Sequence, residues 1–317
     1  MTVVIRTPTR RVDVTGADRL GYLEDVTSQT YQDASAGDVR GALYLDPHGA
    51  PLAMFDVAVL AERVALLVPD EDVATTLVEV LGGRTFLLDA AFELTDDQVL
   101  LLRADDGDSP EDVEVVARSA NLVARPRTVR PAGDGFVIGR DDGVDVVGPA
   151  PLLDELTAAL VDAGAREGGP EDLEAWRVAA GVPAWGSEVA APHLPEEVGL
   201  LPTHVHLGKG CYPGQEAVAR MWMLGRPRRR LAQVVAKEGE LAVGWQAGEG
   251  RKAVTVTSVD PAGGSRALAF VPGAAEPGES FTDDQGTTVE IVSLVGDDPN
   301  PPGHDPAVTQ RRHKPRT

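Results

Sequence analysis

Short runs of alternating apolar and polar residues dominate the first 85 positions, interrupted by two stretches with a helical period. The connections between successive runs are too short for crossover helices, so the runs are predicted to be antiparallel strands. The Thr-Gly-Ala-Asp sequence at 15–18 is typical of a capping box that begins a helix. The expected strands are 11–14, 42–45, 52–60 and 63–68, and the expected helices follow 15–18 and cover 70–81. This part of the chain is therefore predicted to be an α+β unit.

A second mixed pattern covers residues 86–230. Proline at the start and glycine just past the end favour helices here, because proline suits the first turn and glycine the position after the last. The expected strands are 99–102, 136–140 and 144–147, and the expected helices are 109–119, 149–163, 170–180 and 216–223. The pattern predicts a second α+β subdomain.

The pattern changes after Arg230 to short β-prone runs with glycine- and proline-rich connections. Such runs, without any helical period, predict a small all-β unit, a sandwich or a barrel. The runs are 231–235, 252–259, 267–271 and 288–294. From Asp297 the chain is rich in proline and poor in apolar residues, so disorder is expected there. The predicted divisions are 1–85, 86–230, 231–296 and a tail at 297–317.

Composition and charge narrow the possible functions. Of the 317 residues, 43% are hydrophobic, which is enough for sizeable cores, and 50 acids against 29 bases give a formal net charge of -21. A surface this negative disfavours nucleic acid and anionic membranes as partners. A local run of bases at Arg228–Arg230 leaves open a site for one anionic ligand.

The single cysteine excludes an intramolecular disulfide framework, which fits a reducing compartment. No apolar stretch reaches the length of about 20 residues that a membrane-spanning helix needs, and the first residues lack the pattern of a secretory signal. A cytoplasmic location is expected.

The densest candidate chemistry surrounds Cys211. Glycines at 208, 210 and 214 with Pro213 predict a tight loop, in which backbone amides approach a ligand. The thiol lies beside Lys209 and just before a predicted helix, two features that favour a thiolate. A small buried hydrophobe is the other common role of a free cysteine, and the local sequence leaves both interpretations open.

A metal site is the second chemical possibility. His204 and His206 would share one face of an extended segment, with His193 and Cys211 nearby in sequence. This spacing matches no standard zinc pattern, so no stable metal is expected. One cysteine also cannot supply the four ligands of a conventional iron–sulfur cluster.

Several segments carry a family resemblance. The sequence KGCYPGQE at 209–216 resembles the K-x-C-[YF]-x-G-Q-E signature of the YgfZ-type, folate-binding relatives of the glycine-cleavage T protein. RVAAGVP at 177–183 is similar to the family's R-[IV]-x-A-G-x-P, and LPEEVGL at 194–200 to its P-x-E-x-G-L. With the N-terminal VDVTGADRLGYLEDVTSQT, the resemblance spans about residues 10–295.

The resemblance implies a T-protein-like architecture: two linked α+β subdomains with antiparallel sheets, then a small C-terminal β-barrel. It also implies tetrahydrofolate as the cofactor and a role in the assembly or repair of iron–sulfur clusters, with assembly components or client enzymes as partners. Cys211 would be the reactive group and Lys209 would favour its thiolate. The other expected site residues, which shape the loop or bind ligand, are Gly210, Tyr212, Gly214, Gln215, Glu216, Arg220, Arg229 and Arg230.

Two positions depart from the family pattern. Many relatives have glutamate where this chain has Ala179, so pterin recognition would depend on Glu188, Glu196 or the backbone. The transferase also uses an aspartate, and Asp96 or Asp97 lies in the right neighbourhood without the surrounding motif. Enzymatic activity is thus left open. The alternatives are a folate-dependent aminomethyl or one-carbon transferase, and a docking module that has lost folate.

Overall fold

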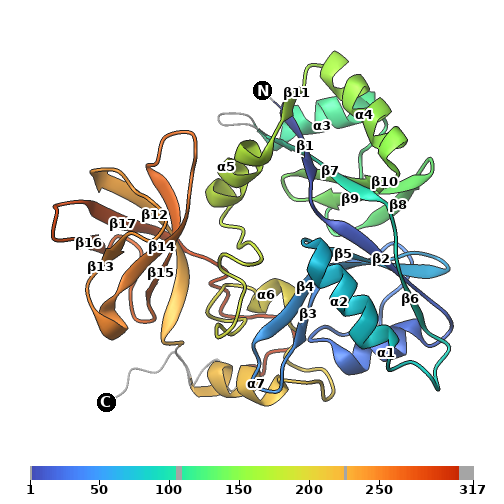
Figure 1. Cartoon of the computed structure of the whole chain (residues 1–317), viewed down its shortest axis with the longest axis horizontal. Helices are drawn as coiled ribbons and strands as arrows, with labels where there is room; N and C mark the ends of the chain where they lie inside the picture. The colour runs from blue at the N-terminus through green and yellow to red at the C-terminus, as the bar shows by residue number, and fades with distance from the viewer. Residues whose placement is uncertain (1, 105–108, 225–226, 307–317) are drawn as a thin grey trace. The chain divides into compact units, whose positions relative to one another are not determined.

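The structure is a computed structural model that describes residues 2–104, 109–224 and 227–306 (Figure 1). The chain divides into two compact units. The first comprises Met1–Asp25, Thr30–Ala42 and Ala53–Leu173, and the second comprises Val26–Gln29, Leu43–Leu52 and Glu174–Thr317. The chain therefore enters the second unit twice before residue 174, with two short segments.

A six-stranded sheet in the first unit has the order β11-β1-β7-β10-β9-β8. The first strand of the chain, β1, is paired on both sides, in parallel with β11 and antiparallel with β7. Helices α3 and α4 pack on this sheet over an apolar core that includes Leu100, Leu102 and Leu153 (Figure 1). The elements are β1 (Thr2–Thr7), β7 (Gln98–Ala104), α3 (Pro110–Ser119), β8 (Val129–Ala132), β9 (Gly135–Arg140), β10 (Gly143–Gly148), α4 (Ala150–Asp162) and β11 (Arg166–Gly168).

A five-stranded sheet follows the order β3-β4-β5-β2-β6. Helix α2 packs against β2, β5 and β6, and begins at Asp70, whose side chain accepts a hydrogen bond from the Val73 N–H at 2.9 Å. The elements are β2 (Arg10–Thr15), α1 (Arg19–Val26), β3 (Val39–Leu45), β4 (Pro51–Val59), β5 (Arg63–Val68), α2 (Glu71–Gly82) and β6 (Ala91–Leu94). The tip of the β3–β4 hairpin, Leu43–Leu52, belongs to the second unit.

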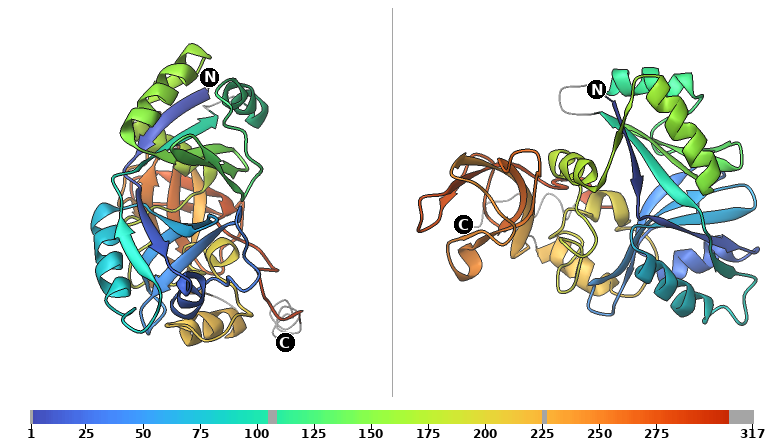
Figure 2. Two further views of the ribbon diagram at one scale, coloured as in Figure 1. Left: turned by 90° about the vertical axis from the view of Figure 1, so that its right-hand side faces the viewer. Right: turned by 45° about the horizontal axis from the view of Figure 1, so that its top comes forward.

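The second unit contains a third sheet, of six antiparallel strands in the order β13-β14-β15-β12-β17-β16. The sheet curls into a nearly closed barrel around a core of small and branched side chains (Figure 2). Most of α5 and all of α6 and α7 also belong to this unit. The elements are α5 (Pro170–Ala180), α6 (Leu201–His204), α7 (Gln215–Leu224), β12 (Arg229–Glu238), β13 (Gln246–Ala247), a 3-10 turn (Gly250–Lys252), β14 (Val254–Val259), β15 (Arg266–Pro272), β16 (Ser280–Thr282) and β17 (Thr288–Leu294).

The α+β class and the C-terminal barrel expected from the sequence are present. The units, however, are divided differently from the predicted ranges 1–85 and 86–230. Strand β6, beyond residue 86, pairs with β2, while β1 joins the sheet of β7 and β10. The pattern did not predict strands β1, β6, β8, β11, β13 and β16 or helix α6.

The first part of the predicted tail lies against the residues just before Lys209. Residues 297–306 of the segment expected to be disordered are described by the structure, and the Leu207 N–H donates to the Pro302 carbonyl at 2.8 Å. Gly303 lies against Gly208 so closely that a Cβ on it would be 2.4 Å from the Gly208 nitrogen. The rest of the tail, with its basic residues, lies outside the described residues. Within the described ranges, no helix is both long and apolar enough to cross a membrane.

Candidate functional site

The loop that ends at α7 holds Lys209 and Cys211 in opposite environments. Cys211 is exposed, whereas Lys209 is only 8% exposed. The Lys209 ammonium donates to the backbone carbonyls of Thr27 at 2.6 Å and of Gln29 at 2.9 Å. Its Nζ also lies 5.1 Å from the centre of the Tyr212 ring, within the range of a cation–π contact. Lys209 therefore anchors the loop to the segment Val26–Gln29 of the same unit.

Tyr212 and Gln215 fasten the loop from the other side. Tyr212 is buried, and burial raises the pKa of its phenol to about 12, so the hydroxyl stays protonated at neutral pH. The Gln215 side-chain amide donates to the Lys209 carbonyl at 3.3 Å, and its backbone N–H donates to the Tyr212 carbonyl at the same distance. The loop is thus closed on itself across Cys211.

Gly214 marks the closest approach of this loop to the β3–β4 hairpin. Its φ of +79° lies in the left-handed region, and a Cβ there would be 2.5 Å from the Asp46 carbonyl oxygen. Gly210 differs: a Cβ on it would meet no atom within 4 Å. Gly214 is therefore sterically required, whereas Gly210 is not.

Cys211 is exposed, so the interpretation that it is a small buried hydrophobe is wrong. The ammonium expected to favour its thiolate is directed to the carbonyls of Thr27 and Gln29 instead. Lys209 therefore positions the loop, and an effect of its charge on the Cys211 thiolate remains a prediction. The reactivity of the thiol remains a prediction.

The remaining expected ligand-binding residues fall into two groups. Glu216, Arg220 and Arg229 are exposed, the first two on α7 and the third at the start of β12. Arg230 instead forms an ion pair with Asp297 at 2.5 Å. The exposed cations of the expected set are therefore Arg220 and Arg229.

Glu197 carries the negative charge of the LPEEVGL segment in a partly enclosed position. Burial acts to raise the pKa of its carboxyl, but nearby His193, with Nδ1 3.9 Å from the carboxylate, the hydrogen bond from the Leu194 N–H at 3.1 Å and the charge of Arg229 outweigh it and lower the pKa. His193 is itself stacked on Phe270, with 4.2 Å between ring centroids. Glu197 thus stays ionised near the start of β12.

A buried polar cluster, missed by sequence reasoning, joins α5 to the barrel within the second unit. Glu188 is fully buried and accepts hydrogen bonds from Arg177 at 3.2 Å, from the Ser258 hydroxyl at 2.6 Å and from the Ala184 N–H at 2.9 Å. Its carboxylate is fully buried and held by protein donors, so the geometry gives no support to recognition of a pterin by Glu188. The sequence did contain one indication of this cluster, Arg177 at the start of the RVAAGVP segment. Ala179, two residues on, is exposed.

The possible metal ligands do not converge. In the parts of the chain that the structure describes, no group of three or more His, Cys, Asp or Glu side chains is arranged to hold a metal ion. Gly303 packs against the ring of His206, where a Cβ would be 2.8 Å from Nδ1. The hypothesis of a metal site built on His204 and His206 therefore has no support in the geometry.

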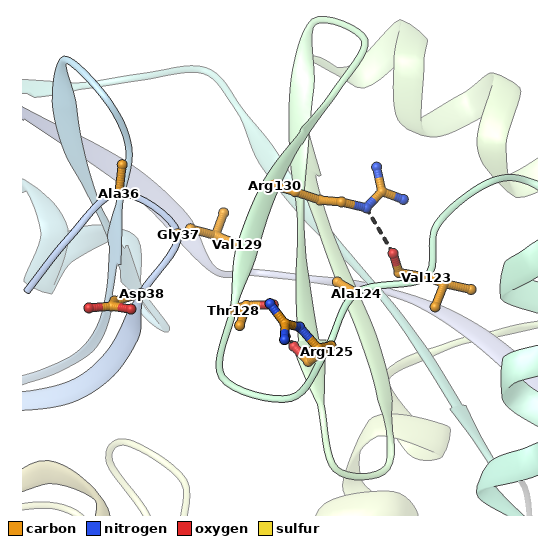
Figure 3. A pocket seen from close by; sticks show the side chains of 9 residues that line it. All are labelled: Ala36, Gly37, Asp38, Val123, Ala124, Arg125, Thr128, Val129 and Arg130. Carbon is orange, nitrogen blue, oxygen red and sulfur yellow. Dashed lines mark hydrogen bonds between the residues drawn. The ribbon is translucent and has the colours of Figure 1, made fainter.

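The first unit contributes two further features. Asp97, one of the two aspartates considered for catalysis, forms an ion pair with buried Arg11, which also binds Asp13. A groove of about 450 Å³ lies elsewhere in this unit (Figure 3). Arg130 on its wall donates to the Val123 carbonyl at 2.8 Å (Figure 3). The groove is lined by residues 36–38, 123–125 and 128–130.

Two sheets, each packed against helices, are followed by a nearly closed antiparallel barrel. This arrangement is a T-protein-like fold. The crystal structure of glycine cleavage system aminomethyltransferase T from Bartonella henselae has this fold: it matches with a TM-score of 0.76 and 16% identity, over 93% of this chain and 86% of that one. At this identity the likeness establishes the fold alone.

Two more solved structures match more weakly. Heterotetrameric sarcosine oxidase from Corynebacterium sp. U-96, in complex with pyrrole 2-carboxylate, matches with a TM-score of 0.35 and 13% identity, over 51% of this chain and 83% of that one. The regulatory subunit of aspartate kinase from Thermus thermophilus matches with a TM-score of 0.27 and 12% identity, over 51% and 97%. No protein-family model and no curated protein sequence matches the chain.

Proposed function

We propose that the chain is a tetrahydrofolate-binding accessory protein for iron–sulfur cluster assembly or repair, and that it acts through Cys211. Three observations support the proposal. The KGCYPGQE sequence resembles the signature of YgfZ-type proteins, the fold is that of the T protein, and the single cysteine is exposed.

The observation that carries the proposal is the contrast between Cys211 and its neighbours. Lys209, Tyr212 and Gly214 are buried and fixed, whereas the thiol between them faces solvent. An exposed thiol on a fixed loop suits transient ligation of a cluster iron, or sulfur exchange with a partner, because the thiolate is the metal ligand and nucleophile. One thiol does not hold a cluster alone, so the cluster would be cargo shared with an assembly component or client enzyme.

The side chains fit tetrahydrofolate only in part. Exposed Arg220 and Arg229 suit the glutamate tail, since guanidinium groups bind carboxylates with paired hydrogen bonds. For the pterin, Glu188 is fully buried and held by three protein hydrogen bonds, so half-buried Glu196 is the more accessible acid of the expected pair. Bound tetrahydrofolate would supply a carrier for one-carbon units.

The first experiment measures cluster-dependent enzyme activity in a strain that lacks the gene for this chain. The wild-type chain should restore activity, whereas Cys211→Ser should restore little. Gly210→Ser, in the same loop at a position with open space, is the matched control and should restore activity fully. Full restoration by Cys211→Ser would refute the proposed role of the thiol.

The second experiment measures tetrahydrofolate binding by calorimetry. Arg220→Ala and Arg229→Ala should weaken binding, whereas Arg251→Ala, at an exposed position of the same unit, should not. The wild-type protein and Cys211→Ala should bind equally if the thiol and the folate act separately. An absence of binding by the wild-type protein would instead favour a docking module that has lost folate, consistent with Ala179 and sealed Glu188.

A folate-dependent aminomethyl or one-carbon transferase is the second candidate function, favoured by the fold alone. The ion pair of Asp97 with Arg11 argues for a structural role of the aspartate region. Turnover of a methylamine-type donor by the purified protein with tetrahydrofolate would establish the transferase.

A further inference from the structure

The loop between α2 and β6 exposes three consecutive large apolar side chains. Phe86 is 86% exposed, Leu87 82% and Leu88 42%. Single exposed apolar residues are ordinary on protein surfaces, but consecutive large ones usually mark an interaction site. Neither the proposed cysteine chemistry nor folate binding uses these residues.

The loop is a defined turn. The Leu88 N–H donates to the Thr85 carbonyl at 2.8 Å, which closes a β-turn with Phe86 and Leu87 at its two central positions. The Thr85 hydroxyl donates to the Gly82 carbonyl at 2.9 Å and joins the turn to the end of α2. Residues 85–88 are named the Phe86 turn.

The far end of the Phe86 turn is tied to the residues before α1. The Asp18 N–H donates to the Asp89 carbonyl at 2.9 Å, and the Asp89 N–H donates to the Asp18 carboxylate at 2.8 Å. Gly16 allows this close approach, because a Cβ on it would be 2.1 Å from the Asp89 carbonyl oxygen. A turn fixed at both ends loses little conformational entropy on binding, which favours recognition.

From this arrangement we infer that the Phe86 turn is a docking site for a partner protein with an apolar pocket that accepts the phenylalanine ring and is bordered by basic residues. The ring supplies the buried aromatic anchor typical of interface hot spots. Exposed Asp18, Asp89 and Glu93 lie at the base of the turn and on the strand after it. The neighbouring bases are fewer: exposed Arg84 precedes the turn, and half-buried Arg19 follows Asp18. Charge complementarity therefore selects a basic rim.

The same charges disfavour two other occupants. Anionic lipid headgroups are repelled by these acids and by the net charge of -21. Two copies of this chain repel each other for the same reason, because each would bring the same acids to the contact.

The test begins with a photo-crosslinking phenylalanine analogue placed at position 86 in cells. The matched control carries the analogue at Val243, which is 69% exposed in a loop of the second unit. Partners cross-linked at 86 but not at 243 are identified by mass spectrometry and purified. Their affinity for the unmodified protein is then measured by calorimetry at low and high salt.

We expect one partner protein, and its affinity for the Phe86→Ser variant should be at least about tenfold weaker than for the wild type. Leu87→Ser should also weaken binding, Val243→Ser should change it less than about twofold, and added salt should weaken it. Thermal unfolding of the variants checks that all of them fold, as exposed substitutions should. Cross-links confined to the same chain or to a second copy, no specific cross-link, or equal affinity of Phe86→Ser would each overturn the proposal.

Discussion

Gly214 and Gly49 lie back to back: a Cβ on Gly214 would be 2.9 Å from the Cα of Gly49. Both have positive φ angles, +79° and +87°. The turn before α7 and the tip of the β3–β4 hairpin thus meet through bare backbone, and this contact fixes the end of the loop that carries Cys211.

Gly214→Ala should lower the free energy of unfolding by about 2–4 kcal/mol, because it adds a clash with the hairpin to a left-handed backbone angle. Gly210→Ala, with open space around it, should change it by less than about 0.5 kcal/mol. Urea denaturation of both variants checks the difference. Equal losses would show that the contact with the hairpin does not matter.

Lys209→Met should destabilise the protein by about 1–3 kcal/mol, because it leaves the carbonyls of Thr27 and Gln29 without their buried donor. Lys237→Met removes only an exposed pair with Glu290 and should cost less than about 1 kcal/mol. Denaturation gives both values, and the rate of Cys211 alkylation is measured alongside. Unchanged stability with slower alkylation would mean that Lys209 serves the thiol instead.

Ionisation of the buried Tyr212 phenol should lower the stability of the protein at alkaline pH. Burial raises the phenol pKa from 10.0 to about 12, so the unfolded chain releases this proton first as the pH rises. The contribution is complete below about pH 10 and is lost between about pH 10 and 12, amounting to about 3 kcal/mol. Tyr212→Phe should show a shallower alkaline loss in urea midpoints. A slope identical to that of the wild type would disprove the assignment.

Glu188→Ala should cost about 1–3 kcal/mol, because it removes one buried counter-charge of Arg177 and leaves the Ser258 hydroxyl and the Ala184 N–H without their acceptor, while Glu174 still pairs with Arg177. The double variant Arg177→Met, Glu188→Leu should be more stable than Glu188→Ala, since it removes both charges. Glu290→Ala, which breaks a more exposed pair, is the control and should cost less than about 1 kcal/mol. Thermal and urea unfolding distinguish these outcomes, and a double variant weaker than the single would contradict the electrostatic explanation.

Local pattern predicted the elements whose side chains have a clear period or cap. Helices α2 and α3 begin at Asp70 and Ser109 with side-chain caps, and hairpin β9–β10 shows plain alternation. Strand β1, TVVIRT, has the β-branched composition of a strand, so the sequence analysis overlooked a local signal. Its pairing with β7 and β11, far along the chain, is what the local pattern could not indicate. Strand β6 has only four residues and gives too short a signal.

Contacts between residues far apart in sequence could not be predicted at the candidate site either. The sequence placed Lys209 beside Cys211 and suggested that they act together. The carbonyls that bind the ammonium belong to residues 182 and 180 positions away, which adjacency in sequence cannot indicate. Exposure of the thiol and burial of the lysine depend on that distant segment.

The placement of β1 also bears on how the chain is made. β1 leaves the ribosome before both of its neighbours, β7 at Gln98–Ala104 and β11 at Arg166–Gly168. Its apolar side chains therefore wait through the synthesis of more than half of the chain before the six-stranded sheet closes around them. At synthesis rates of about 5–20 residues per second, that wait lasts on the order of ten seconds or more. During this time the apolar nascent segment Val3-Val4-Ile5 has no sheet to pair with and is prone to aggregation.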